Sequence, residues 1–300
     1  MDRFEAMRTL VAAVDGGSLS AASRSLRVPL PTVSRRVSDL EAHLRAQLVV
    51  RTSRKLLLTD AGAAFVATCR RVLDDLDEAE RAASGEYRAP RGDLLITAPV
   101  MFGRLHVEPV VLEFLAAYPE VNVRLILADY VIDLVENHVD LALRIGPLPD
   151  SSLVASRLGA VRWVACASPA YLARRGTPQT PADLAAHCCI AFEGLYSSNR
   201  WTFGSGRDAI AVPFRPRLAV NTADGAIDAA RAGLGIARLL SYQVAAPLAD
   251  GSLDLVLGGF EPDPLPVHLV HAGHAQLPQK LMAFRNFAMP RLKARLGAGL

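Results

Sequence analysis

The sequence predicts an α/β protein in which a winged helix-turn-helix module is followed by one long helix and then by a larger α/β domain. Three observations support this prediction. At 300 residues the chain exceeds the length that one hydrophobic core usually serves. Apolar residues recur at helical spacing as far as position 83, and beyond Gly92 strand-like and helix-like runs alternate. The excess of basic residues lies only at the N-terminal end.

The charge distribution separates the modules. Residues 1–91 hold 15 Lys and Arg against 12 Asp and Glu, residues 92–300 hold 18 of each, and residues 20–59 hold 8 against 2. A local excess of this kind indicates an anionic partner for the first module alone. Hydrophobic residues make up 51% and charged residues 21%, which is typical of a folded chain and not of a disordered one.

The first 26 residues predict two helices. The apolar face of the first is formed by Phe4, Met7, Leu10, Val11 and Val14. Gly16 and Gly17 are expected to end it, and Ser18 to cap a short second helix over 19–26. Ala21 and Ala22 are small enough to let another helix cross the second one closely.

A third helix is predicted from Pro31, because proline is tolerated at the first helical position. Its buried stripe comprises Val33, Val37, Leu40 and Leu44. The opposite face is polar and basic, and short hydroxyls with guanidinium groups can reach base edges and phosphates in a major groove. The predicted DNA-contacting residues of the helices are Ser18, Pro31, Thr32, Ser34, Arg35, Arg36 and Ser38.

Residues 48–59, LVVRTSRKLLLT, place apolar runs on both sides of a basic tip and so predict a two-stranded wing. Arg51, Arg54 and Lys55 are expected to meet the DNA backbone. The alternative is an ordinary three-helix bundle with a solvated basic face, since this geometry also occurs where no DNA is bound. The localised positive charge favours DNA binding.

Three linked motifs occur in order: F-x-x-M-x-x-L-V-A-A-V-D-x-G-S-L-S-A-A-S-x-S-L, then P-T-V-S-R-R-V-S-D-L-E-x-x-L, then L-V-V-R-T-S-R-K-L-L-L-T-D-A-G. With them the chain resembles the LysR-type transcriptional regulators along nearly its whole length. The resemblance implies a winged helix-turn-helix over 1–60, a linker helix that pairs two subunits, and a two-lobed effector-binding domain similar to periplasmic binding proteins. It also implies promoter DNA, RNA polymerase and further copies of the chain, as a dimer or tetramer, as partners.

Three positions depart from the family pattern. The family often has Ser or Thr where Pro29 stands and a polar residue where Leu30 stands, so a cap and a base-reading amide are missing. Arg45 occupies a position that is usually Gly, and it is expected either to extend the third helix or to add a phosphate contact.

Residues 61–83 predict one amphipathic helix, followed by a hinge that ends near residue 91. The apolar stripe of this helix includes Phe65, Cys69, Val72, Leu76 and Ala79. A helix with one narrow stripe needs a partner, which the family resemblance implies to be the same helix of a second subunit. The alternative is that the stripe packs on the chain's own C-terminal domain.

Residues 92–300 alternate between strand-like and helix-like runs, which predicts a mainly parallel sheet covered by helices. Strands are expected over 94–99, 121–127, 140–146, 161–168, 188–192, 218–221, 235–239 and 267–272. Helices are expected over 102–117, near 131–137, from 169, over 222–232 and over 279–296. The resemblance assigns lobe I to about 92–162 and 267–300, and lobe II to about 163–266.

Ligands of such sheets bind at the carboxyl ends of strands, beside helix N-termini. The predicted effector contacts are Thr97, Pro99, Val100, Met101, Arg144, Ser197, Asn199, Asn221 and Thr222. The alternative is that these residues only satisfy loop ends. Because the first loop is apolar at 98–101, an apolar or aromatic part of a small-molecule effector is expected there.

Other chemistry has weaker support. His268, His271 and His274 fall on an expected strand that runs into a loop, where their spacing does not gather metal ligands, and the contiguous His187, Cys188 and Cys189 point apart. The four cysteines lack a CxxC and are expected to be buried thiols. No cofactor or catalytic motif is found, no export signal or membrane-spanning run is seen, and a cytoplasmic regulator is favoured over an enzyme or a solute-binding protein.

Overall fold

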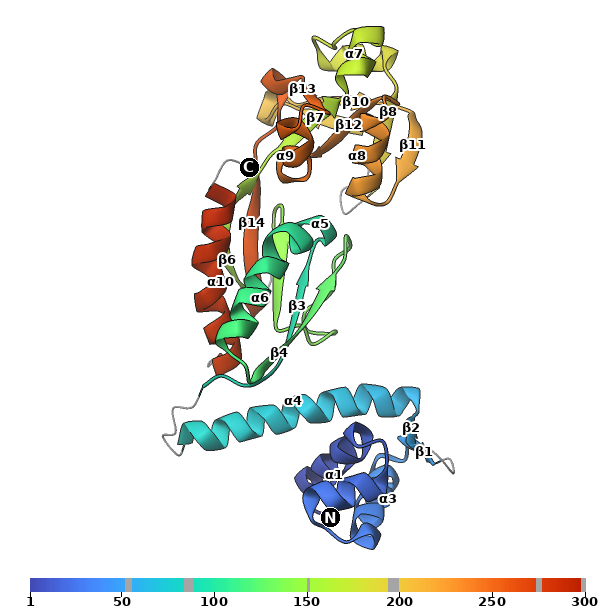
Figure 1. Ribbon diagram of the computed structural model, residues 1–300, viewed down its shortest axis with the longest axis vertical. Coiled ribbons are helices and arrows are strands. Elements are labelled where there is room, and N and C mark those ends of the chain that lie inside the picture. The colour runs from blue at the N-terminus through green and yellow to red at the C-terminus, as the bar shows by residue number, and fades with distance from the viewer. Residues whose placement is uncertain (52–55, 84–88, 150–151, 194–199, 274–276, 298–300) are drawn as a thin grey trace. The chain divides into compact units, whose positions relative to one another are not determined.

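The computed structural model describes residues 1–51, 56–83, 89–149, 152–193, 200–273 and 277–297. The chain divides into two compact units, Met1–Arg88 and Ala89–Leu300, and each has its own hydrophobic core (Figure 1). Among the described residues, no helix is both long enough and apolar enough to cross a membrane.

The N-terminal unit contains α1 (Arg3–Asp15), α2 (Leu19–Leu26), α3 (Leu30–Leu44), the strands β1 (Val49–Arg51) and β2 (Leu56–Leu58), and α4 (Asp60–Ala83). The predicted cap is confirmed, because Ser18 Oγ accepts a hydrogen bond of 3.1 Å from the Ala21 amide. The core of the helices is formed by Ala6, Leu10, Ala13, Ala22, Val33, Val37 and Leu40. It places α3 across α1 and α2, as a helix-turn-helix requires.

The ends of the predicted apolar stripes differ from expectation. Phe4 and Leu44 are exposed, because each stands at a helix end beyond the neighbouring helices. Helix α3 begins at Leu30, so Pro31 is its second residue, and Pro29 at the N-cap makes no side-chain hydrogen bond. Arg45 does not extend the helix, since its φ of 51° places it in the left-handed region and ends α3.

The predicted wing is confirmed as an antiparallel hairpin in which Val49 pairs with Leu58 and Arg51 with Leu56. The start of the hairpin is fixed by a carboxylate of α3. Glu41 Oε1 accepts from the amides of Leu48 at 2.8 Å and Val49 at 3.1 Å. One carboxylate of α3 therefore holds the wing against this helix.

Lobe I of the C-terminal unit is built on a five-stranded sheet in the order β4-β3-β5-β14-β6. The strands are β3 (Gly92–Ala98), β4 (Val121–Leu127), β5 (Leu141–Ile145), β6 (Leu153–Val161) and β14 (Leu265–Ala272). Helices α5 (Val100–Phe102), α6 (Glu108–Ala117) and α10 (Gln279–Gly297) belong to the same lobe (Figure 1). A π-helical turn, Gly103–Val107, joins α5 to α6.

Lobe II has a second five-stranded sheet in the order β11-β8-β12-β7-β13. Its strands are β7 (Trp163–Ala167), β8 (Cys189–Phe192), β11 (Pro216–Val220), β12 (Ile236–Leu240) and β13 (Asp254–Val256). Its helices are α7 (Pro169–Arg175), α8 (Ala223–Arg231) and α9 (Ser241–Ala249). The chain leaves lobe I at the end of β6, enters lobe II through Arg162, and returns to lobe I at Leu265, where β14 begins.

Two predictions for the C-terminal unit are wrong. The sheets are mixed and not mainly parallel, because β14 pairs antiparallel with β5 and β6, and β7 pairs antiparallel with β12 and β13. No helix forms over 131–137. There Asp133 Oδ1 accepts from the amides of Val135 and Glu136, both at 2.8 Å, and this local turn ends at His138 with a positive φ of 54°.

Several elements were not predicted from the sequence. They are β6, β13, α9 and a separate hairpin of β9 (Arg200–Phe203) with β10 (Ile210–Pro213). Residues Pro181–Ala186 form a 3-10 helix, which was not predicted either. Three of the four cysteines are buried as expected, whereas Cys188 is half-buried.

Candidate functional sites

The outward face of α3 is the first candidate site. Pro31, Arg35 and Ser38 are exposed, and Thr32 and Ser34 are half-buried. Within the described residues Arg35 has no ion pair, so its guanidinium is available at the surface. The face combines hydroxyls and a cation above the buried side chains of Val33, Val37 and Leu40, which is the chemistry that base edges and phosphates require.

Arg36, which was expected to contact DNA, is engaged within the unit. Its Nη1 lies 2.9 Å from Glu5 Oε2 and 3.4 Å from Thr9 Oγ1, both on α1. Ser18 likewise has a structural role, as the cap of α2. The positive charge of Arg36 is therefore compensated by a carboxylate.

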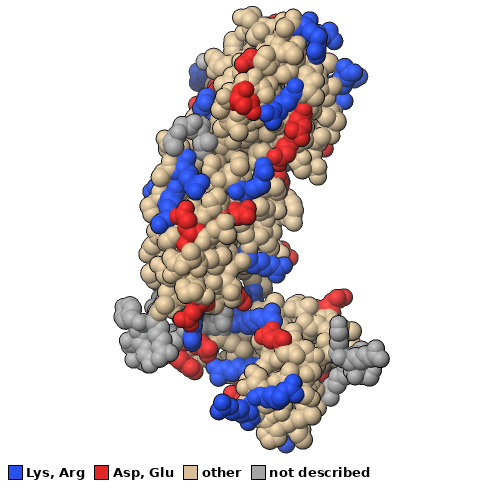
Figure 2. All heavy atoms as spheres, viewed as in Figure 1, with Lys and Arg blue, Asp and Glu red and all other residues tan. Residues whose placement is uncertain are grey.

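The basic tip of the wing falls at 52–55, so Arg54 and Lys55 lie outside the described residues, as does the side chain of Arg51. The described strands fix where the tip begins and ends, at Arg51 and Leu56. On the visible face of the N-terminal unit, Lys and Arg side chains lie with acidic side chains beside some of them (Figure 2). The ion pairs of Arg8, Arg36 and Arg70 therefore compensate these three charges locally.

The predicted dimer stripe of α4 is divided between two environments. Cys69 is 1% exposed, and burial raises the pKa of its thiol to about 11. Phe65 packs partly on the core of the N-terminal unit, whereas Val72 is 37% exposed and Leu76 is half-buried. The side chain of Ala79 lies outside the described part. One edge of α4 is thus covered by its own chain, and the edge at Val72 is open.

The predicted effector residues lie in different settings. Thr97 is 1% exposed, and its Oγ1 has no hydrogen-bond partner among the described residues. The Val100 amide donates to Asp129 Oδ1 at 3.0 Å, and Arg144 Nη2 donates to the Ile132 carbonyl at 2.7 Å. Both of these groups are occupied by lobe I itself.

The remaining predicted positions are divided between the two lobes. Thr222 is the N-cap of α8, and its Oγ1 accepts from the Gly225 amide at 3.2 Å. Pro99 and Met101 are buried, while Asn221 is exposed. Ser197 and Asn199 lie outside the described residues.

The structure brings the first loop of lobe I close to lobe II through residues that the sequence did not single out. Arg104 Nη2 lies 3.0 Å from Asp224 Oδ1, in the first turn of α8. The ring of Phe102 meets the ring of Tyr242 edge-on, with centroids 5.3 Å apart, and His106 packs on both rings. Arg104, Phe102 and His106 thus line the lobe I side of the junction.

Ionisable groups at this junction are perturbed by burial. Burial raises the pKa of Asp129, and the nearby Asp224 carboxylate raises it further, against the opposing hydrogen bond from Val100. Burial also raises the pKa of Tyr242, with a further contribution from Asp129. The junction therefore favours neutral or hydrogen-bond-donating groups over additional carboxylates.

Only some of the residues at the junction between the lobes could have been identified from the sequence. Asp224 follows Thr222 as an acid in a first helical turn, which is a local signal. Asp129 and Tyr242 are far apart in sequence, and their proximity depends on the packing of α5 against α9. Nothing local identifies such a pair.

The other chemistry considered has no site in the described part of the chain. No group of three His, Cys, Asp or Glu residues there could hold a metal ion. His268 and His271 lie on β14, as predicted, and point to opposite faces, while His274 is outside the described residues. His187 Nδ1 lies 3.1 Å from the Tyr171 hydroxyl, which also accepts from the Cys188 amide.

Two family models match the chain. Residues 4–63 match the bacterial regulatory helix-turn-helix protein, lysR family, and residues 88–293 match the LysR substrate binding domain.

Full-length relatives agree with these matches. The chain is 37% identical over 288 residues to an HTH-type transcriptional regulator of Xanthomonas campestris pv. campestris, covering 94% of this chain and 83% of the relative. It is 34% identical to an HTH-type transcriptional repressor of Pseudomonas aeruginosa, covering 96% and 92%. It is also similar to the structure of CrgA, a LysR-type regulator from Neisseria meningitidis, with 30% identity, a TM-score of 0.59 and 98% of both chains covered.

Proposed function

The chain belongs to the LysR family of DNA-binding transcriptional regulators, and from this membership we propose how its residues divide the work of binding DNA, pairing subunits and sensing an effector. The family consists of oligomeric regulators and not of enzymes. The observation that carries the proposal is the face of α3, where Val33, Val37 and Leu40 are buried and Arg35 is exposed on the opposite side.

In the proposed DNA contact, α3 enters a major groove and the wing follows the adjacent backbone. The residues proposed to contact the groove are Pro31 in the first turn of α3, Thr32, Ser34, Arg35 and Ser38. Arg51, Arg54 and Lys55 of the wing meet phosphates, which adds affinity but no sequence preference. Pro29 and Leu30 offer no polar side chain at the start of α3, so base reading is concentrated further along the helix.

Subunit pairing is proposed to use the open edge of α4. Val66, Cys69 and Leu73 are buried in the single chain, whereas Val72 is exposed. We therefore assign Val72, Leu76 and Ala79 to the partner helix, with Phe65 at the border of the two surfaces. Val72→Glu should shift the chain toward monomer in sedimentation, because it places a charge in an apolar helix pair.

The effector is proposed to bind between the lobes, near Pro99–Met101 and Thr222. Asp129 occupies the Val100 amide, so this backbone donor is not free to receive a ligand carboxylate, and one N–H group of Arg144 is bonded to the Ile132 carbonyl. Met101, Phe102 and Tyr242 are buried and make the junction behind this loop apolar and aromatic. We propose a small effector with an aromatic or apolar body, and further contacts from Ser197 and Asn199.

The proposed domain boundaries are 1–60, 61–91 and 92–300, with crossings between lobes near 162 and 266. We also propose that the protein acts in the cytoplasm, at promoters, and contacts RNA polymerase there. Effector binding changes the spacing of the two DNA-reading heads.

A gel-shift titration of the full chain on DNA that flanks its own gene tests the function, with a scrambled duplex of the same length as control. We expect salt-sensitive binding that prefers the natural duplex. Arg35→Ala should reduce that preference, and Lys55→Ala should weaken both duplexes similarly and lower the salt slope by about 1. Equal binding of the two duplexes by the wild-type chain would contradict the proposal.

A further inference from the structure

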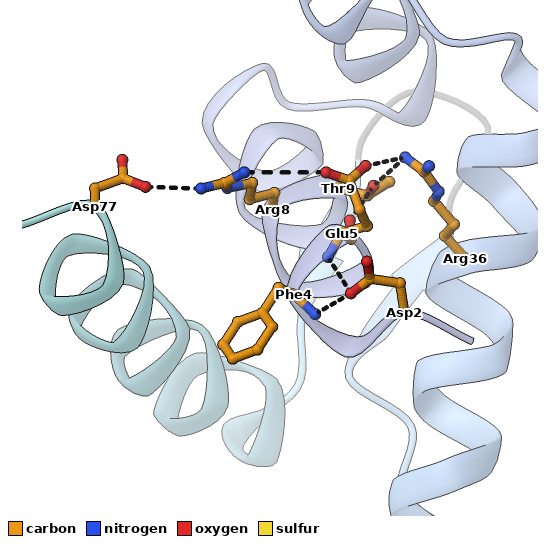
Figure 3. Close-up of polar contacts among 7 residues, drawn as sticks. All are labelled: Asp2, Phe4, Glu5, Arg8, Thr9, Arg36 and Asp77. Atoms are coloured by element: carbon orange, nitrogen blue, oxygen red, sulfur yellow. Dashed lines mark hydrogen bonds and ion pairs between the residues drawn. The ribbon is translucent and has the colours of Figure 1, made fainter. Parts of the chain in front are cut away.

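An alternating row of charged side chains runs through the N-terminal unit from α4 to the recognition helix. It consists of Asp77 on α4, Arg8 and Glu5 on α1, and Arg36 on α3 (Figure 3). Asp77 Oδ1 lies 2.7 Å from Arg8 Nη2, and Glu5 Oε2 lies 2.9 Å from Arg36 Nη1. The middle step, from Arg8 Nη1 to Glu5 Oε1, is 4.0 Å.

The α1 end of the row is rigidly supported. Asp2 Oδ1 accepts from the amides of Phe4 at 3.0 Å and Glu5 at 3.3 Å, which fixes the first turn of α1. Thr9 is buried, and its Oγ1 donates to the Glu5 carbonyl at 2.6 Å while accepting from Arg36. The Arg36 guanidinium is thus held by a carboxylate and by a buried hydroxyl.

The exposed fractions indicate how these groups act. The Arg36 side chain is 27% exposed and the Glu5 side chain 41%. A single pair at such exposure changes an equilibrium by no more than about fivefold. A row of four alternating charges that joins three helices is better suited to setting an angle than to stabilising the fold.

We propose that Arg36 is a positioning residue and not a DNA contact, and that Asp77, Arg8, Glu5 and Arg36 together fix the orientation of the recognition helix on α4. The inference rests on the proposed function, in which α4 pairs two subunits and α3 enters the groove. In a dimer the angle between α3 and α4 sets the separation of the two recognition helices. The row therefore determines which half-site spacing the protein accepts.

The test uses the full chain and a duplex selected by the wild-type chain from a random-sequence library. Two further duplexes lengthen or shorten the spacer between the half-sites by one base pair. Arg36→Gln and Asp77→Asn should each reduce the discrimination between spacers, by about fivefold. Their combination should reduce it no further, because both break the same row.

The salt slope separates positioning from DNA contact. Arg36→Gln should leave the slope of log K against log salt unchanged, whereas Lys55→Gln, which removes a proposed phosphate contact, should lower it by about 1. As a control, a cooperative thermal unfolding transition is measured for each variant to check that it is folded.

A slope lowered by Arg36→Gln as much as by Lys55→Gln would overturn the positioning role. Additive effects of Arg36→Gln and Asp77→Asn, or unchanged spacer discrimination, would overturn the continuous row. A wild-type chain that selects no duplex would overturn the DNA-binding function, and the inference with it.

Discussion

Replacing Gly62 by alanine is expected to weaken the joint between the wing and α4. A Cβ on Gly62 would lie 1.9 Å from the Leu48 carbonyl oxygen and 2.8 Å from its carbon, both backbone atoms. Ordinary contact begins at 3.4 Å, so the two backbone segments must separate by 3.4 − 1.9 = 1.5 Å. No flexible side chain can absorb this displacement.

The loss of folding free energy can be estimated from the contacts between the wing and α4. The Leu48 carbonyl accepts from the Thr59 amide at 3.0 Å, and the Leu48 amide donates to Glu41 at 2.8 Å. Losing one or two such hydrogen bonds costs about 1 kcal/mol each. Overpacking adds about 1–3 kcal/mol, and the better helix propensity of alanine returns about 1 kcal/mol. The net loss is therefore about 1–4 kcal/mol.

Urea unfolding of the full chain, followed by circular dichroism, measures the effect as a lower midpoint for the N-terminal unit. Gly297→Ala is the matched control, because nothing lies within 4 Å of a Cβ at that helical position. DNA affinity of the Gly62 variant should fall as well, since the wing moves. A Gly62→Ala protein as stable as the wild type, or as the Gly297 variant, would refute the packing argument.

Three further predictions concern the C-terminal unit. Arg104→Gln should change its free energy of unfolding by less than about 1 kcal/mol, because both partners of the Arg104–Asp224 pair are 53% exposed; a larger loss in urea unfolding would contradict this. Phe114→Ala should cost about 3–5 kcal/mol, since the buried ring packs edge-on against a second phenylalanine, whereas Leu112→Ala on the exposed side of the same helix should cost little. Burial lowers the pKa of His106 from 6.5, so below that pH the folded state binds fewer protons than the unfolded chain and stability is lost as the pH falls. His106→Gln should make the midpoint less dependent on pH between 7.5 and 5.5, and an unchanged dependence would contradict the cause.

The N-terminal unit could be predicted closely because its signals are local. Ser18 caps α2, the stripe of Val33, Val37 and Leu40 is buried, and the hairpin forms around the basic tip. Each of these features depends on residues within about one helix length. Where the prediction departed, at Leu44, the side chain stands beyond the helices that would have covered it.

The C-terminal unit was predicted less completely, because its topology depends on distant pairing. Alternation of strand and helix patterns identified most strands, but no pattern distinguishes a strand that returns from the other lobe, such as β14, from one that continues in parallel. The segment near Asp133 carries helical spacing, yet its side chain bonds to the backbone and stops the turn. The occupied Val100 amide could not be anticipated either, since Asp129 reaches it from another strand end.

The charge of the N-terminal unit illustrates why composition alone overstates a DNA-binding surface. Arg8, Arg36 and Arg70 each form an ion pair with an acid of the same unit, and for Arg70 that acid is Asp15. In each pair the nearby carboxylate offsets the positive charge of the arginine, so this arginine attracts a DNA phosphate less strongly. Arg35 has no such pair within the described residues, although it is adjacent to Arg36 in sequence. Two neighbouring arginines on one helix therefore take different roles: the direction each faces decides whether its charge holds the fold or is presented to DNA.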